Sequence, residues 1–202
     1  MNKLALIITQ ILLTGQVFAS NSLEVGYGKG ELEGESVKST TIQYTYTPKN
    51  TKKMFGGKLG YSLGVRSTFY KADLFQAADN NSEFLEDLDV SSHNIFGQIQ
   101  YQYDIFQIGF NLDLIGISSS SSSKVQGSTT EVKNETFNAF LFAKNDKGSL
   151  NSQFFFLLDL NPVVIKAGLA HSLITFENTG LSDDDNRQRF FNTIFGTLGY
   201  MF

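Results

Sequence analysis

The sequence predicts an all-β protein, an antiparallel up-and-down β-barrel that crosses a membrane with its strands. Three observations lead to this prediction. Long stretches of the 202-residue chain alternate between apolar and polar side chains, as strands with two unlike faces do. With 19 Phe and 8 Tyr against only 2 Pro, the composition favours strands over helices. The chain also ends on an apolar aromatic strand, whereas the termini of soluble domains are usually solvated.

The last stretch, Thr193–Phe202, is the clearest of these strands. One face of its period-2 pattern carries Ile194, Leu198, Tyr200 and Phe202. A sheet edge cannot lie open in hydrocarbon, because its backbone N–H and C=O groups would have no hydrogen-bond partners. We therefore expect this strand to close the barrel by pairing with the first strand.

The first 19 residues have the pattern of a secretory signal peptide. Lys3 supplies the positive start, Leu4–Leu13 the apolar core and Val17–Ala19 a small-residue cleavage site. The apolar core is shorter than the roughly 20 residues that a spanning helix needs. We predict cleavage after Ala19, a single barrel domain over residues 20–202, and no lipid anchor, because no Cys follows the cleavage site.

Composition excludes several classes of function. The chain has no Cys, and so neither disulfides nor thiolate metal ligands. A formal net charge of −4 provides no basic field for nucleic acid. The acidic run Asp183–Asp185 lacks the spaced carboxylates that wrap a calcium ion, and we interpret it as a solvated loop. We expect no cofactor, no metal and no nucleic-acid partner.

Nine stretches of the chain qualify as candidate strands. They are Ser22–Glu31, Val37–Thr47, Lys58–Tyr70, Asn94–Asp104, Phe106–Leu114, Glu135–Lys144, Asn151–Leu160, Pro162–Asn178 and Thr193–Phe202. An up-and-down barrel with both ends on one side of the membrane has an even number of strands. We predict eight, with ten as the alternative, and expect one segment between Glu135 and Leu160 not to span.

Three polar stretches between the candidate strands are expected to be exposed surface loops. They are Lys71–Asp89, Ile117–Asn134 and Thr179–Arg189. The second contains six consecutive serines, Ser118–Ser123, a composition typical of a flexible segment.

The polar faces of the strands carry amides and charges, which we assign to the barrel interior. The assigned residues are Glu24, Arg66, Gln98, Gln100, Gln102, Asp104, Asn111, Asp113 and Lys166. In water, the apolar faces of the strands would need a covering layer, and the sequence has no amphipathic helix to supply one. In a membrane barrel, lipid covers the apolar faces and the polar faces pack together in the interior. This set could line a pore. An eight-stranded barrel is only wide enough for its side chains to fill, however, so we interpret the set as a plug of paired charges.

His171 is the single weak candidate for a catalytic residue. It is followed directly by Ser172, and neighbouring residues in a strand face opposite sides of the sheet. A His on the outer face cannot easily activate a Ser that points into the lumen. The other histidine, His93, has no obvious Ser partner in the sequence, and we interpret it as a rim residue. The sequence therefore predicts a protein that is not an enzyme.

The signal-like Met1–Ala19, the alternating strands, the alternately short and long connections and the ending Gly199–Phe202 together resemble the small outer-membrane barrels of the OmpX and opacity-protein type. The resemblance implies a monomer in the outer membrane of a Gram-negative-type bacterium, in contact with outer-membrane lipid and lipopolysaccharide. The terminal aromatic strand is similar to the signal that the barrel-assembly machinery recognises.

The resemblance implies a structural or adhesive role that is carried out by the extracellular loops. A small porin-like pore and an outer-membrane lipid-modifying enzyme are the alternatives, because one fold supports many functions. The sequence names no external ligand.

Overall fold

The computed structural model describes most of the chain from Ala19 onward. The described residues are 19–32, 35–48, 51–76, 84–125, 131–139, 150–176 and 187–202. The expected signal peptide, except for its last residue Ala19, and the acidic run at 183–185 lie outside this part. In the described residues there is no helix with the length and apolar character needed to cross a membrane.

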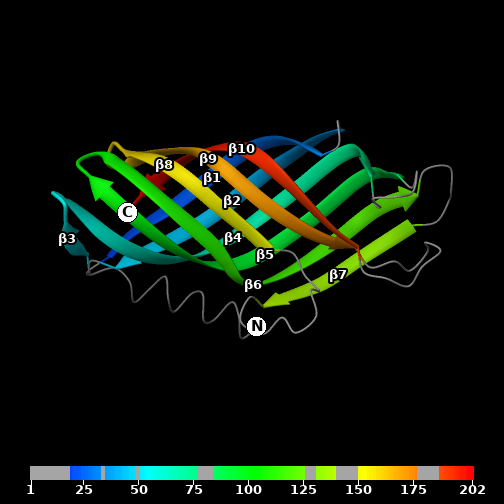
Figure 1. Cartoon of the computed structure of the whole chain (residues 1–202), viewed down its shortest axis with the longest axis horizontal. Coiled ribbons are helices and arrows are strands. Elements are labelled where there is room, and N and C mark those ends of the chain that lie inside the picture. The colour runs from blue at the N-terminus through cyan, green and yellow to red at the C-terminus, as the bar shows by residue number, and fades with distance from the viewer. Residues whose placement is uncertain are drawn as a thin grey trace.

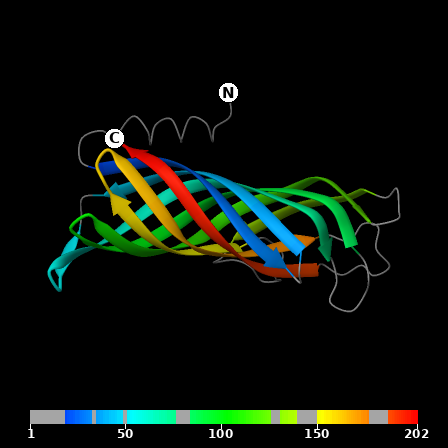
Figure 2. The same cartoon turned by 90° about the horizontal axis from the view of Figure 1, so that it is seen from above.

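Eight strands close into one antiparallel barrel, as predicted (Figures 1 and 2). In ring order they are β1 (Ala19–Leu32), β2 (Glu35–Pro48), β4 (Gly57–Gln76), β5 (Phe84–Tyr103), β6 (Phe106–Val125), β8 (Leu150–Asp159), β9 (Val163–Phe176) and β10 (Arg187–Met201). β10 returns to β1 and closes the ring. We call the end of the barrel at which Ala19 and Phe202 lie the terminus end.

Two further strands do not widen the ring. β7 (Glu131–Ala139) pairs with the part of β6 farthest from the terminus end, Ile115–Lys124, whereas β8 pairs with Phe106–Leu112. β7 and β8 therefore follow one another along the same edge of β6, and only β8 lies on the ring path. β3 (Lys52–Met54) is a short addition to the start of β4. The ninth candidate strand of the sequence is thus explained by β7.

The strands continue through much of what the sequence predicts to be loops. β4, β5 and β6 have 20 residues each, about twice the length that a spanning strand needs. The predicted loops at Lys71–Asp89 and Ile117–Asn134 were therefore too long, and the serine run belongs to β6. A β ladder is made of backbone hydrogen bonds, so it continues beyond the apolar segment wherever a neighbouring strand continues.

The last residue of the chain lies in the closing seam. The backbone N–H of Phe202 donates to the carbonyl of Asn21 at 3.0 Å, and the N–H of Asn21 donates to the carbonyl of Phe202 at 3.1 Å. Ile194, Leu198, Tyr200 and Phe202 are all exposed on the outer face. The first and last strands pair continuously from Ser22 opposite Met201 to Glu31 opposite Asn192, which closes the ring over this length.

The barrel is apolar outside and polar inside. The outward-facing positions include Leu23, Val25, Tyr27, Ile42, Tyr61, Leu63, Val65, Ile95, Ile99, Ile108, Phe110, Phe154, Phe156, Ile165, Leu169, Ile194, Leu198 and Tyr200, all exposed. Most of the buried side chains are polar or charged. This is the reverse of a water-soluble barrel, and it fits an exterior solvated by lipid.

Glycine at two inward-facing positions makes room for aromatic rings inside the barrel. A Cβ at Gly64 would overlap the ring of Phe96, and a Cβ at Gly109 would overlap the ring of Phe155. Both rings are fully buried. The small residues opposite them let two large side chains fit into a narrow lumen.

We expect Gly109→Val to lower the free energy of unfolding by about 1–3 kcal/mol, the usual cost of overpacking a filled interior. Urea unfolding of the barrel in lipid vesicles measures this change. Gly196→Val is the matched control, because Gly196 is exposed and the nearest atom to its Cβ position is 3.9 Å away. Equal losses in the two variants would contradict the assignment of Gly109 to the crowded interior.

Candidate functional site

Two buried ion pairs cross the middle of the lumen. Lys166 Nζ of β9 lies 2.7 Å from Glu24 Oε2 of β1, and the guanidinium of Arg66 on β4 pairs with the carboxylate of Asp113 on β6. Each pair reaches past one intervening strand, β10 in the first case and β5 in the second. None of the four residues is more than 2% exposed. Charges buried this deeply require partners, and here each has one of opposite sign.

Hydroxyl groups complete the surroundings of Glu24. Thr197 Oγ1 donates to Oε2 at 2.8 Å, and Ser22 Oγ donates to Oε1 at 3.0 Å. Both carboxylate oxygens therefore accept hydrogen bonds in addition to the ion pair with Lys166. The three partners come from β1, β9 and β10, so this cluster also ties the closing seam together.

Amide side chains surround the second ion pair. Arg66 Nη1 donates to Asn111 Oδ1 at 2.8 Å, and Asn151 Nδ2 donates to Asp113 Oδ2 at 2.8 Å. Asn111 Nδ2 in turn donates to Gln153 Oε1 at 3.1 Å. The network links β4, β6 and β8 across the lumen. Each end of the ion pair is thus fixed by an amide from another strand.

Two of the aromatic rings inside the barrel lie against the two cations. The Arg66 guanidinium carbon is 5.1 Å from the centre of the Phe96 ring, and Lys166 Nζ is 4.8 Å from the centre of the Phe155 ring. Both distances are within the range of cation–π attraction. Cations, carboxylates and rings are thus buried together inside the barrel. We call the set of Glu24, Arg66, Phe96, Asp113, Phe155 and Lys166 the plug.

The lumen remains filled on the side of the plug away from the terminus end. The Tyr70 hydroxyl donates to Asn151 Oδ1 at 3.0 Å and lies 3.0 Å from Ser172 Oγ. The cavity between Arg66, Tyr70 and their neighbours has a volume of about 10 Å³. This is about the space for a single water molecule. The hydrogen-bonded layer of Tyr70, Asn151 and Ser172 therefore narrows the lumen beyond the plug.

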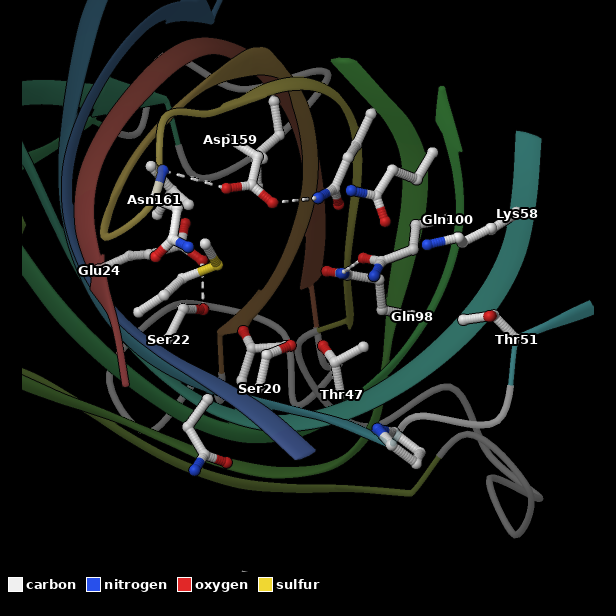
Figure 3. A pocket seen from close by; sticks show the side chains of 18 of the residues that line it. Ser20, Ser22, Glu24, Thr47, Thr51, Lys58, Gln98, Gln100, Asp159 and Asn161 are labelled. Atoms are coloured by element: carbon white, nitrogen blue, oxygen red, sulfur yellow. Dashed lines mark hydrogen bonds between the residues drawn. The ribbon is translucent and has the colours of Figure 1, made fainter. Parts of the chain in front are cut away.

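A larger cavity lies on the other side of the plug, at the terminus end (Figure 3). Its volume is about 490 Å³, and its wall consists mainly of hydroxyl and amide side chains with Lys58 and Asp159. In Figure 3 the labelled side chains, among them Gln98, Gln100 and Thr47, surround this space. Lys58 is exposed, so the cavity reaches the surface, and Glu24 lies in its wall beside the plug. The lumen is therefore open at the terminus end and ends at the plug.

The residues assigned to the interior from the sequence fall into three groups. Five are in the buried networks at the middle of the barrel: Glu24, Arg66, Asn111, Asp113 and Lys166. Gln98, Gln100 and Gln102 line the cavity at the terminus end. Asp104 is a correction, because it is exposed in the turn between β5 and β6 with a φ of 52°. The alternation was continued one residue past Tyr103, where β5 ends and the backbone changes direction.

Several interior residues were missed in the sequence. Asn151 and Gln153 alternate with the exposed Phe154 and Phe156, so a period-2 reading of that stretch could have found them. Tyr70 is two positions beyond Thr68 on the face of Arg66, which gives it the same signal. Phe96 and Phe155 carry no such signal. An aromatic residue at a position of the polar face suggests that the alternation has been assigned one residue out of place.

The two histidines lie on the outer face. His171 Nδ1 is 2.7 Å from Asn192 Oδ1, whereas its neighbour Ser172 points into the lumen. His93 is a correction, because it does have a Ser partner: its Nδ1 is 2.9 Å from Ser67 Oγ. Ser67 was missed because it lies on the neighbouring strand, 26 residues earlier. No cluster of three or more His, Asp or Glu that could hold a metal ion occurs among the described residues.

Comparison with known proteins shows likeness in structure alone. No family model matches the chain, and no curated protein matches its sequence. Neisserial surface protein A is similar in structure with a TM-score of 0.51 and 11% identity, over 90% of this chain and 96% of that one. Ail, the attachment invasion locus protein of Yersinia pestis, has a TM-score of 0.46 and 14% identity, over 92% of this chain and 100% of that one. The outer membrane enzyme PagL has a TM-score of 0.48 and 12% identity, over 86% of this chain and 97% of that one.

Identities this low indicate a common fold and nothing about activity. The closed ring of eight antiparallel strands, the apolar exterior and the filled polar interior agree with that fold. The chain therefore has the fold of a small eight-stranded barrel of the outer-membrane type, as in Neisserial surface protein A.

Proposed function

We propose that this protein is a non-conducting scaffold of the outer membrane, with a structural or adhesive role at the cell surface. The observation that supports this proposal is the plug. Two ion pairs and two aromatic rings occupy the lumen where a pore would need open space. With the interior filled, the outer ends of the strands and their connections are the parts left to meet other molecules.

The ends of the barrel differ in a way that supports one orientation. At the terminus end, β5 and β6 are joined by Asp104–Ile105 and β8 and β9 by Leu160–Pro162, whereas β2 and β4 are joined by residues 49–56, which include β3. At the other end two residues separate β1 from β2, but seven separate β4 from β5 and ten separate β9 from β10. Short turns are typical of the periplasmic side and longer connections of the outside. We therefore orient the terminus end toward the periplasm. The long β4, β5 and β6 then project outward beyond the membrane, and binding commonly resides at such ends of a rigid scaffold.

Planar-bilayer recording tests the non-conducting part of the proposal. We expect the refolded mature chain, residues 20–202, to insert without current steps, because the plug leaves no continuous aqueous path. Insertion is verified separately by the shift in gel mobility between unheated and heated samples. Stable, repeated current steps from inserted protein would contradict the proposal and favour a small pore.

The surface role is tested by shortening the projecting β6–β7 hairpin. Ser120 and Asn134 are paired, so residues 121–133 can be replaced by Asn-Gly, a two-residue hairpin turn. We expect cells displaying this variant to lose the adhesion to host cells or surfaces that the full chain confers. The matched control replaces Asp104–Ile105 at the other end with Asn-Gly and should adhere normally. Equal adhesion of all three chains would contradict a role for this hairpin.

The enzyme alternative is tested at the two outward histidines. We expect His171→Ala and His93→Ala to leave the lipid composition of the outer membrane unchanged, because both rings lie on the outer face of the barrel and Ser172, next to His171, is buried in the lumen. Mass spectrometry of extracted lipid A and phospholipid gives the comparison, with cells lacking the protein as reference. Lipid hydrolysis would be established if an acyl chain present in cells lacking the protein were missing from cells with the wild type and present again in cells with either variant.

A further inference from the structure

Three lysines lie side by side on the outer surface, on three consecutive strands. In the β1–β2 ladder Lys29 is directly opposite Lys38, and in the β2–β4 ladder Lys38 is directly opposite Lys71. All three are exposed. Lys29 is on the same face of β1 as the exposed Tyr27, so the row points away from the lumen. We call Lys29, Lys38 and Lys71 the lysine row.

Like charges directly opposite one another in an antiparallel pair destabilise a sheet. Lys71 is compensated, because its Nζ lies 3.3 Å from Asp89 Oδ2 on β5. Lys29 and Lys38 form no ion pair with any residue that the structure describes. Glu31 and Asp73 lie on the same face, each two residues farther from the terminus end. Two adjacent cations therefore remain without a counter-ion from the described protein.

The lysine row begins where the apolar exterior ends. On β1 the outward residues from the terminus end are Leu23, Val25, Tyr27 and then Lys29, the first three being 49–54% exposed. Lys29 is the eleventh residue of β1, and Lys38 is the eleventh from the end of β2. A tilted strand crosses the hydrocarbon in about 9–11 residues. Lys29 and Lys38 are thus at the level of the lipid headgroups, at the end away from the termini.

We propose that Lys29 and Lys38, extended by Lys71, bind the phosphate groups of a glycolipid in the outer leaflet. An ammonium donates up to three hydrogen bonds, and charge-assisted bonds to phosphate oxygens are among the stronger kinds. A phosphate between the two lysines removes their mutual repulsion. The acyl chains of the same lipid would lie on the adjoining apolar surface, which includes Val25 and Ile42. This continuity between cations and apolar surface favours a lipid over a free anion.

The proposal rests on the proposed orientation, in which the terminus end faces the periplasm, and is independent of whether the lumen conducts. Its test compares the folded wild type with K29Q/K38Q in detergent micelles titrated with purified bis-phosphorylated lipid A. We expect the double variant to bind at least about tenfold more weakly, since each cation near a phosphorylated surface contributes on the order of a few-fold in affinity. K29R/K38R should retain most of the binding.

The matched control is K52Q/K53Q. Lys52 and Lys53 are also neighbouring exposed lysines, but they lie on β3 at the terminus end. This control should bind lipid A as the wild type does. Unchanged binding in K29Q/K38Q, or an equal loss in K52Q/K53Q, would overturn the proposal. Equal binding of dephosphorylated lipid A, or full competition by millimolar inorganic phosphate, would overturn the role of a lipid phosphate. A conducting wild type would contradict the proposed function and leave this result standing.

Discussion

Lys166→Met is expected to lower the free energy of unfolding of the barrel by about 3–5 kcal/mol, the usual consequence of removing one member of a buried ion pair. The substitution leaves the carboxylate of Glu24 buried, at 1% exposure, without its cation. Thr197 and Ser22 still donate hydrogen bonds to it, but hydroxyl groups do not neutralise its charge. A loss of this size is a large part of the stability of an ordinary domain. Urea unfolding in lipid vesicles, followed by tyrosine fluorescence or circular dichroism, measures it.

The double variant Glu24→Gln with Lys166→Met should recover most of this loss. It removes both charges, so no isolated ion remains, and the cost of burying the pair disappears with its attraction. Lys58→Met is the matched control, because Lys58 is an exposed lysine in the wall of the terminus-end cavity with no ion pair among the described residues. Its effect should stay within about 0.5 kcal/mol, as for most surface substitutions. A small effect of Lys166→Met, similar to that of Lys58→Met, would mean that water reaches Glu24.

The sequence was informative about which side of the sheet each residue faces. In a strand of period 2, a single correctly placed residue determines the orientation of the rest. Glu24, Arg66 and Lys166 alternate with apolar residues over long stretches, and in the structure all three are buried. The eight-stranded closed barrel followed from the same alternation and from the apolar last strand. Asp104 shows the limit of the method, because the alternation stops where the strand stops.

The sequence was much less informative about which residues meet. Glu24 and Lys166 are 142 positions apart, and their contact depends on the register of β1, β10 and β9 together. No pattern within one strand contains that register. The same is true of Ser67 beside His93 and of the lysine row, each of which is made by neighbouring strands. Strand length was also underestimated, because polar residues such as Ser118 pair as well through their backbone as apolar ones do.

Opening one half of the plug should convert the silent barrel into a conducting one. In the variant Arg66→Ala, Asp113→Ala and Phe96→Ala, an ion pair and a ring are removed together, so that no buried charge is left alone. The cavity of about 490 Å³ at the terminus end would then extend past the level at which the lumen is now closed. We expect small, repeated current steps in planar bilayers, where the wild type gives none.

The informative comparison is with Gln98→Ala and Gln100→Ala, which enlarge the terminus-end cavity and leave the plug intact. If the plug alone closes the lumen, this control stays silent although side-chain volume has been removed from the cavity wall. Current in the control would place the closure at the glutamines. Silence in the folded, inserted triple variant would place it farther outward, at the level of Tyr70 and Asn151, where the next hydrogen-bonded layer crosses the barrel. Each result assigns the closure to a named layer of side chains, because the three layers occupy successive levels along the same lumen.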